Sequence, residues 1–204
     1  MKINENDLSR IATAVKVAEQ NTSGEIVPVI LKQSDLYPAA HFRLSLVVGI
    51  TFAIGCYYGY EFEDPITLLW FQLPGMLIGY LLAYIPQIKR AFSTGQELSE
   101  ESYQRAVQVF HEHNVSMTRD RTGIMIFITL LERKVYIMAD AGINQQVADD
   151  YWDQMVATLV ESIKNGRAVE GLEEAIKECG NSLSSAFPRQ SDDQNEISDD
   201  LVTE

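Results

Sequence analysis

Two unbroken apolar runs stand out from an otherwise periodic sequence of hydrophobic and polar positions. The runs cover residues 44–60 and 66–87, carry no charged side chain, and each approach the roughly 20 residues that cross a hydrocarbon core. Only residues 61–65 separate them, so the pattern predicts an antiparallel transmembrane helical hairpin over residues 42–88. The alternative is a pair of core helices in a soluble protein, which are usually shorter.

Periodic segments in front of the hairpin predict one helix and one strand. Apolar residues recur at intervals of three and four positions up to Glu19, which places them on one face of a helix that ends before Gly24. The following segment, residues 25–31, is short and rich in branched residues, as strands are. Its Pro28 lacks a backbone N–H and therefore predicts an edge position or a bulge.

Periodic segments behind the hairpin predict three helices and two strands. One helix begins at Ser99 with acids in its first turn, and two further helices cover residues 145–164 and 167–179. Strands are predicted over residues 123–131 and 134–139, separated by Glu132 and Arg133 in a tight hairpin turn. The first of these strands is apolar on both faces, which favours a central position in the sheet.

Together these elements predict an α/β fold of about three strands and four helices. Its first part covers residues 1–35 and its second part residues 97–186, so the hairpin interrupts one domain rather than preceding it. The segment 189–204 is rich in acids and poor in large apolar side chains, a composition that predicts a disordered acidic tail.

Charge adds an expected location. The formal net charge of −13 argues against nucleic-acid binding, which needs clustered basic residues. Basic residues flank the outer ends of the hairpin, whereas its connecting loop is acidic; the flanking residues are Lys32, His41, Arg43, Lys89 and Arg90. Positive residues near membrane helices favour the cytoplasmic side, and residues 1–19 show no signal-peptide pattern. We therefore expect a bacterial inner-membrane protein with two spans, both termini and the soluble domain being cytoplasmic.

Each apolar run also carries two glycines four positions apart, Gly55 with Gly59 and Gly75 with Gly79. Glycines at this spacing let two membrane helices approach closely. They are compatible with packing inside the hairpin and with self-association of two copies.

The run from Asp120 to Ile143 joins an acid, a glycine, an apolar strand, a Glu-Arg turn, a second strand and Asp140-Ala-Gly142. With the strand Glu25-Ile-Val-Pro-Val-Ile, it resembles the TPM domain, named for thylakoid-lumen, photosystem-repair and levamisole-receptor-modulator proteins. The resemblance covers about residues 4–182 outside the hairpin. It implies an α/β sandwich, in which helices flank a small β-sheet. Some TPM domains are described as acid phosphatases or divalent-metal binders, and others assist membrane complexes.

Candidate metal ligands are Glu25, Asp120 and Asp140, which stand at the ends of predicted strands, where α/β sheets often place ligands. Carboxylates suit Ca²⁺ or Mg²⁺. The alternative is that these acids are solvated turn residues or helix caps.

Candidate phosphate-binding residues are Arg121 and Arg133, because a guanidinium can bind a phosphate through two hydrogen bonds. The alternative is that they form ion pairs or contact lipid headgroups. No nucleophile motif accompanies them, so catalysis rests on the resemblance alone. The sequence favours a non-catalytic assembly or regulatory factor that binds the bilayer and another membrane protein. The alternative function is that of a divalent-metal-dependent phosphatase-like hydrolase.

Overall fold

The computed structural model describes residues 4–60, 64–146, 151–192 and 194–203. The chain divides into two compact units: unit 1 comprises residues 1–34 and 102–204, and unit 2 comprises residues 35–101. The later boundary falls within helix α5 (Gly95–Glu112). Unit 2 is longer than the hairpin predicted over residues 42–88, because it also contains α4 and the start of α5.

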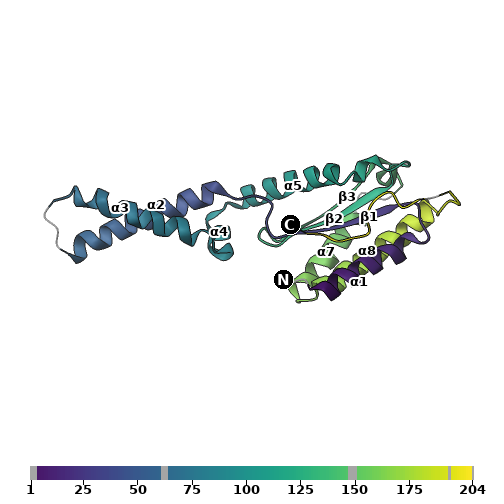
Figure 1. The fold of residues 1–204 in the computed structure, drawn as a ribbon, viewed down its shortest axis with the longest axis horizontal. Helices are drawn as coiled ribbons and strands as arrows, with labels where there is room; N and C mark the ends of the chain where they lie inside the picture. The colour runs from purple at the N-terminus through teal and green to yellow at the C-terminus, as the bar shows by residue number, and fades with distance from the viewer. Residues whose placement is uncertain (1–3, 61–63, 147–150, 193, 204) are drawn as a thin grey trace. The chain divides into compact units, whose positions relative to one another are not determined.

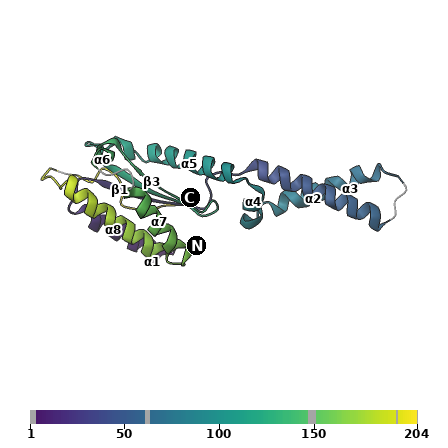
Figure 2. The same ribbon diagram turned by 180° about the vertical axis from the view of Figure 1, so that it is seen from behind.

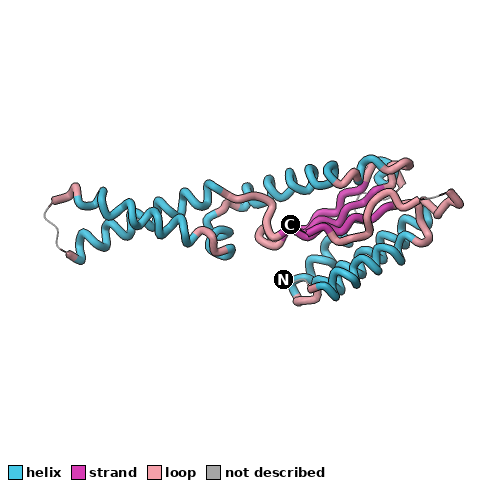
Figure 3. The backbone as a smooth tube through the Cα atoms, in the orientation of Figure 1, coloured by secondary structure: helices cyan, strands magenta, loops and turns pink. Residues whose placement is uncertain are grey.

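Unit 1 is built on a four-stranded sheet with the order β3-β2-β1-β4. Its strands are drawn in magenta in Figure 3. At its centre β1 (Glu25–Leu31) and β2 (Gly123–Thr129) run parallel, while β3 (Lys134–Ala139) pairs antiparallel with β2 and β4 (Val202–Thr203) pairs parallel with β1. Every residue of β1 and β2 is buried, as expected for strands covered on both faces. The predicted α/β fold is therefore confirmed, with one more strand than expected.

Helices cover both faces of this sheet (Figures 1 and 2). One face packs against α1 (Glu5–Glu19), α7 (Tyr151–Lys164) and α8 (Ala168–Ala186), and the other against α5. Because successive strand residues point to opposite faces, neighbouring side chains enter different cores. Those on the α1, α7 and α8 side include Ile26, Ile30, Ile124, Ile126 and Ile128, and those on the α5 side include Val27, Val29, Leu31, Met125 and Phe127.

Three helix bounds differ from those predicted by periodicity, and a side-chain cap explains one of them. Helix α5 begins at Gly95 rather than Ser99, because the Glu97 carboxylate accepts from the Thr94 N–H at 2.8 Å and the Thr94 hydroxyl accepts from the Glu97 N–H at 3.2 Å. The helix predicted from residue 145 is described from Tyr151 onward as α7, and residues 147–150 lie outside the described residues. The last helix continues to Ala186 rather than ending at Cys179.

The expected edge position of β1 holds for its first half only. Backbone N–H groups point alternately to the two neighbours of a strand. The Glu25 N–H donates toward the β2 side, to Thr122 O, whereas the Ile26 N–H donates to the Glu19 carboxylate at 2.7 Å. Pro28 therefore lies on the same side as Ile26, and β4 pairs with β1 only beyond it. The missing N–H of Pro28 leaves no ladder hydrogen bond unmade.

The segment after α8 differs from the expected disordered tail. Leu201 is buried in the core of unit 1, and β4 pairs with β1. The Glu196 N–H also donates to the Glu25 carboxylate at 3.0 Å. Composition reflects the many acids of this segment, but it does not reflect the contacts that Leu201 and Val202 make with the core and with the edge of β1.

In unit 2, α2 (Pro38–Gly59) and α3 (Thr67–Leu82) pack side by side through their smallest residues. A Cβ added to Gly75 would lie 2.9 Å from Gly49 Cα, and a Cβ added to Gly79 would lie 2.7 Å from Ser45 Cα. A Cβ added to Gly55 or Gly59 would meet no described atom within 4 Å. The second glycine pair thus packs inside the hairpin, and the first pair makes no such contact with the described residues.

The apolar runs and the helices differ in their bounds. Helix α2 begins at Pro38, before the run that starts at residue 44, and α3 ends at Leu82, before the run that ends at residue 87. Residues preceding proline avoid the helical conformation, and Ile85 accordingly has an extended backbone before Pro86. The chain then bends by 111° into α4 (Pro86–Phe92).

By length and composition, one described helix, Pro38–Gly59, is able to cross a membrane. A second is added if Thr67–Leu82 and the bent segment Pro86–Phe92 form one span. Most of the predicted connecting loop, residues 61–63, lies outside the described residues.

Several of the basic residues used to predict orientation are engaged within unit 2. Arg43 donates to both carboxylate oxygens of Glu97, at 2.6 and 2.8 Å. Together with the Thr94 N–H, this guanidinium lowers the pKa of Glu97 to about 2. His41 is buried, with its ring centroid 5.0 Å from those of Tyr80 and Tyr84. His41 and Arg43 lie inside α2 rather than before it, so they belong to the packed base of the hairpin.

Candidate functional site

Three of the predicted site residues lie at one end of the sheet in unit 1. Glu25 begins β1 opposite Gly123, which begins β2, and the Asp140 N–H donates to Gly123 O at 2.9 Å. Asp120 lies shortly before β2. The structure thus brings Glu25, Asp120 and Asp140 to the end where both parallel strands start. Ligands of parallel sheets usually bind at the opposite, carboxyl end.

Asp140 is bound by a neighbouring arginine and caps a short helix. Its side chain is only 5% exposed and accepts from Arg121 Nε at 2.5 Å and from Nη2 at 2.7 Å. The same carboxylate accepts from the Ala141 N–H at 2.7 Å, at the start of α6 (Ala141–Asn144). These contacts with Asp140 raise the pKa of Arg121. Arg121 and Asp140 thus form an ion pair in which the two opposite charges are in direct contact.

The Asp-x-Gly sequence has a structural reason in this loop. Arg121 adopts a left-handed backbone with φ of 58°, which is uncommon for a residue with a side chain. The Gly142 N–H donates to Arg121 O at 3.1 Å, and a Cβ on Gly142 would lie 2.6 Å from that oxygen. Asp140 and Gly142 therefore fix the Arg121 loop from two sides.

The other two acids have separate surroundings. Glu25 is 6% exposed and accepts from the Glu196 N–H, whereas the Asp120 side chain is 42% exposed and lies 3.6 Å from Arg119. A further acid, Glu19, lies beside Glu25 and was not predicted from the sequence. Burial raises its pKa to about 8; the hydrogen bond from the Ile26 N–H opposes this shift, and the charges of Glu25 and Asp199 add to it. Its only sequence signal was an acid in the last turn of α1, where the helix dipole disfavours one.

These acids, as placed, do not fit one divalent-cation site. Both oxygens of Asp140 already accept hydrogen bonds from Arg121, and the described part of the chain contains no group of three His, Cys, Asp or Glu side chains able to hold a metal. A Ca²⁺ or Mg²⁺ ion would need several of these oxygens at once. The predicted ligands lie at one end of the sheet, but their carboxylate oxygens do not converge on one position where a metal ion could bind.

The two predicted phosphate-binding arginines are not brought together. Arg121 precedes β2 and Arg133 follows it, so the length of a seven-residue strand, roughly 23 Å at 3.3 Å per residue, separates them. Arg133 completes the turn into β3, also with a left-handed backbone, at φ of 56°. A single phosphate cannot bind both side chains.

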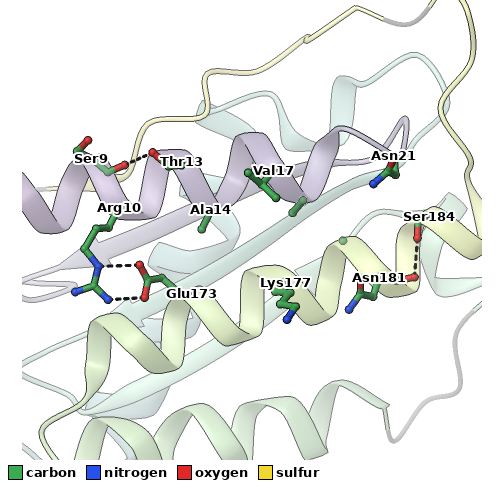
Figure 4. A pocket seen from close by; sticks show the side chains of 12 residues that line it. Ser9, Arg10, Thr13, Ala14, Val17, Asn21, Glu173, Lys177, Asn181 and Ser184 are labelled. Carbon is green, nitrogen blue, oxygen red and sulfur yellow. Dashed lines mark hydrogen bonds and ion pairs between the residues drawn. The ribbon is translucent and has the colours of Figure 1, made fainter.

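A shallow groove of about 560 Å³ runs between α1 and α8 (Figure 4). At one end Arg10 donates to both oxygens of Glu173, at 2.9 and 2.6 Å. The floor is made where Gly180 meets Ala18, since a Cβ on Gly180 would lie 2.7 Å from the Ala18 Cβ. Its charged end is thus neutralised by its own ion pair.

We expect Asp140→Asn to lower the free energy of unfolding by about 2 kcal/mol at pH 7, because it removes the charge that holds Arg121 while an amide oxygen can still cap α6. Urea unfolding of unit 1 measures this. Arg121→Asn suits the left-handed backbone but leaves Asp140 buried without its cation. The double variant should therefore lose less than the sum of the single losses, by about 2 kcal/mol. Strict additivity would contradict the pairing as a source of stability.

Comparisons with known proteins identify this fold. The family model described as the TPM domain matches residues 87–182. The NMR structure of the BA42 protein from the psychrophilic bacterium Bizionia argentinensis is similar, with a TM-score of 0.63 at 21% sequence identity over 100% of this chain and 97% of that chain. A comparison with curated proteins gave no match. The match over residues 87–182 and the shared fold support the resemblance seen in the strands and in the Asp-x-Gly sequence, and this part of the chain is a TPM domain.

Proposed function

We propose that this chain is a membrane-anchored TPM-domain protein that acts as a non-catalytic assembly or regulatory factor for a membrane complex. The observation that supports the anchoring is that unit 2 buries small side chains between its helices and exposes large apolar ones, the reverse of a water-soluble helix pair. Ser45, Gly49 and Ala53 of α2, and Gly75 and Gly79 of α3, are buried. The large apolar side chains point outward, and they include Leu46, Val47, Ile50, Phe52, Leu69, Trp70, Leu73 and Leu77.

This distribution is favourable in lipid and unfavourable in water. In water, burial of large apolar side chains between helices would be the main source of stability. In hydrocarbon that driving force disappears, and helices associate through small residues that let their backbones meet. Exposing eight or more large apolar side chains to water, as the hairpin does, would cost about 1.5–3 kcal/mol for each one fully exposed. A bilayer supports this arrangement without that cost.

Both helices serve as spans in this proposal. Helix α2 has 22 residues, about 33 Å at 1.5 Å per residue, and α3 has 16 residues, about 24 Å. The hydrocarbon core is about 30 Å thick, and a shorter helix is accommodated by local thinning of the bilayer. The basic residues near the base of the hairpin favour a cytoplasmic domain at a bacterial inner membrane. Gly55 and Gly59, which pack against nothing described within the chain, suit contact with a second membrane helix.

The non-catalytic role is supported by the chemistry of the strand ends. Asp140 and Arg121 neutralise each other, and Arg133 lies at the opposite end of β2. A metal-dependent phosphatase would need these groups free and convergent on one phosphate. The contacts therefore favour a scaffold for a partner protein over a hydrolase.

Two measurements test the proposal. Native membranes are washed with alkaline carbonate, and the full chain is expected in the pellet until detergent is added. Cross-linking in the same membranes is expected to recover a reproducible protein partner, and loss of that partner from cells is expected to change the amount of an assembled complex. Release by carbonate would contradict the anchor, and cross-links to lipid alone would contradict the assembly role.

Orientation is tested with single cysteines in a chain whose Cys56 and Cys179 are replaced by serine. Cysteine at Asp64 should react with a membrane-impermeant maleimide added to intact spheroplasts, and cysteine at Ser198 should react only after lysis. The reverse pattern would overturn the cytoplasmic domain.

A further inference from the structure

A second hollow, of about 740 Å³, lies in unit 1 at the carboxyl end of β2. The turn from β2 to β3 forms one side, and the end of α7 and the start of α8 form the other. Apolar side chains supply much of the lining, and they include Leu130, Val135, Val160, Ile163 and Val169. In α/β sheets this is the end at which ligands usually bind.

Three basic side chains line the same hollow: Arg133, Lys134 and Lys164. Within the part of the chain that the structure describes, none of the three side chains makes a hydrogen bond or an ion pair. By contrast, five arginines outside the hollow lie against a carboxylate: Arg10, Arg43, Arg105, Arg119 and Arg121. In a chain with a net charge of −13, these three side chains give the hollow a local excess of positive charge.

The two acids that line the hollow already have contacts of their own. Asp7 accepts from the Asn4 N–H at 3.0 Å as part of the cap of α1, and Glu170 lies 3.7 Å from Arg10. They therefore compete little for the three cations. The local charge available to a ligand is positive.

The backbone defines the positions from which two of these side chains extend, those of Arg133 and Lys164. Arg133 occupies the left-handed position of the turn, where Gly or Asn is more usual. Gly166 ends α7 with φ of 76°, which is typical of the residue after a helix, and so fixes the last turn that carries Lys164. Non-glycine residues with a left-handed backbone, such as Arg133, are concentrated at functional sites.

The ligand that fits such a hollow carries an anion on an apolar body. Arg and Lys side chains bind phosphate oxygens through charged hydrogen bonds, and the apolar lining favours hydrocarbon over a fully polar molecule. A phosphate ester linked to an acyl chain or glycerol backbone satisfies both parts. The shared chemistry is that of a phospholipid headgroup region or of a free phosphate ester.

Chain connectivity favours the lipid as the source. The Ser34 N–H and hydroxyl both donate to the Glu132 carboxylate, at 2.8 and 2.7 Å, and Arg133 is the next residue. Ser34 is also the last residue of unit 1 before the chain enters the apolar helix α2. The turn that carries Arg133 is thus tied to the segment that leads into the proposed anchor.

We propose that the hollow bounded by Arg133, Lys134 and Lys164 binds the phosphate of an anionic phospholipid. The TPM domain would then bind the surface of the membrane to which it is tethered. This inference rests on the proposed membrane anchoring for the identity of the ligand. The site itself belongs to unit 1 and can be measured whether or not the hairpin spans a bilayer.

The test uses the full chain in an uncharged maltoside detergent and the short-chain lipid dihexanoylphosphatidylglycerol. Calorimetric titration is expected to show saturable binding that weakens as salt is raised, because the contact is ionic. Dihexanoylphosphatidylcholine, which has the same chains without net charge, is expected to bind at least tenfold more weakly. Equal binding of both lipids would overturn the site. If carbonate releases the chain from membranes but the short-chain lipid still binds, the proposed anchoring is wrong and the lipid site stands.

Matched variants locate the binding. Each basic residue near a lipid phosphate contributes about fivefold in affinity, so Lys134→Gln with Lys164→Gln should weaken binding about 25-fold. Lys16→Gln with Lys177→Gln makes the same change in net charge at exposed positions outside the hollow and should change binding less than twofold. Arg133→Asn suits the left-handed turn, so its expected fivefold loss cannot be assigned to misfolding. Equal losses in both double variants would overturn the location.

Glycerol 3-phosphate separates the two sources of phosphate. The apolar lining predicts that it binds at least tenfold more weakly than the short-chain lipid, since it lacks acyl chains. Binding of equal strength, abolished by the Lys134 and Lys164 changes, would overturn the lipid in favour of a free phosphate ester.

Discussion

Replacing Gly79 by leucine is expected to destabilise the hairpin of unit 2 by about 3 kcal/mol, whereas the same change at Gly55 leaves it nearly unaffected. A Cβ at Gly79 would lie 2.7 Å from Ser45 Cα and 2.8 Å from Leu44 O, both of which are backbone atoms. Backbone cannot move aside as a flexible side chain does, so α2 and α3 would have to separate. At Gly55 a Cβ would meet no described atom within 4 Å.

The measurement exploits the two tryptophans, Trp70 in α3 and Trp152 in α7. In a Trp152→Phe background, Trp70 alone reports on the hairpin while sodium dodecyl sulfate is titrated into maltoside micelles. The Gly79→Leu transition should move to lower denaturant, and the Gly55→Leu transition should coincide with that of the parent. Equal shifts would mean that the hairpin is not held by close packing of small residues. A shift confined to Gly55→Leu would mean that α2 packs through its other face.

Sequence patterns predicted the elements of unit 1 because each signal was local. The strand from Gly123 is apolar on both faces and is central and buried, and the spacing of Val15 and Ile11 on α1 places both in the core. A turn between β2 and β3 was also predicted, but as Glu132 and Arg133 alone after a strand to residue 131; β2 ends at Thr129, and residues 130–133 connect the two strands. These features depend on residues close to one another in the chain, which is the information that a periodicity contains.

The missed features depend on contacts between distant residues. The helix start at Gly95 is the exception, because the Thr94–Glu97 capping box is legible in the sequence, although Ser99 with its following acids gives a competing signal. By contrast, no pattern indicates that Leu201 returns to the core or that Arg121 is bound by Asp140. The predicted site residues were therefore located correctly as strand ends, while their partners, which decide their chemistry, came from elsewhere in the chain.

The apolar runs illustrate a third kind of error. A window of uncharged residues ignores backbone constraints, so the second run was extended to residue 87 although Pro86 forces Ile85 out of the helical conformation. The helix ends at Leu82, and the chain turns by 111°. Proline position, rather than hydropathy, sets where this helix stops.

Glu19→Gln is expected to stabilise unit 1 by about 3 kcal/mol at pH 9 and to leave it unchanged at pH 4. Burial raises the pKa of Glu19 to about 8 in the folded chain, compared with 4.5 for an ordinary glutamate. Between these two values the folded state holds a proton that the unfolded state has lost, so the contribution of Glu19 to stability falls as pH rises from about 4.5 to about 8. A tenfold difference in proton affinity between the two states corresponds to about 1.4 kcal/mol, and partial exposure of the side chain reduces the total.

Glutamine separates charge from hydrogen bonding at this position. Its amide oxygen can still accept from the Ile26 N–H, the group that has no strand partner beside Pro28, but it carries no charge near Glu25 and Asp199. Urea unfolding followed by Trp152 fluorescence in a Trp70→Phe background measures unit 1 at each pH, and Glu174→Gln on the exposed face of α8 is the matched control. A gain of equal size at pH 4 and pH 9 would contradict a titrating Glu19. A loss at both would show that the carboxylate, rather than any acceptor oxygen, is needed to close the open edge of β1.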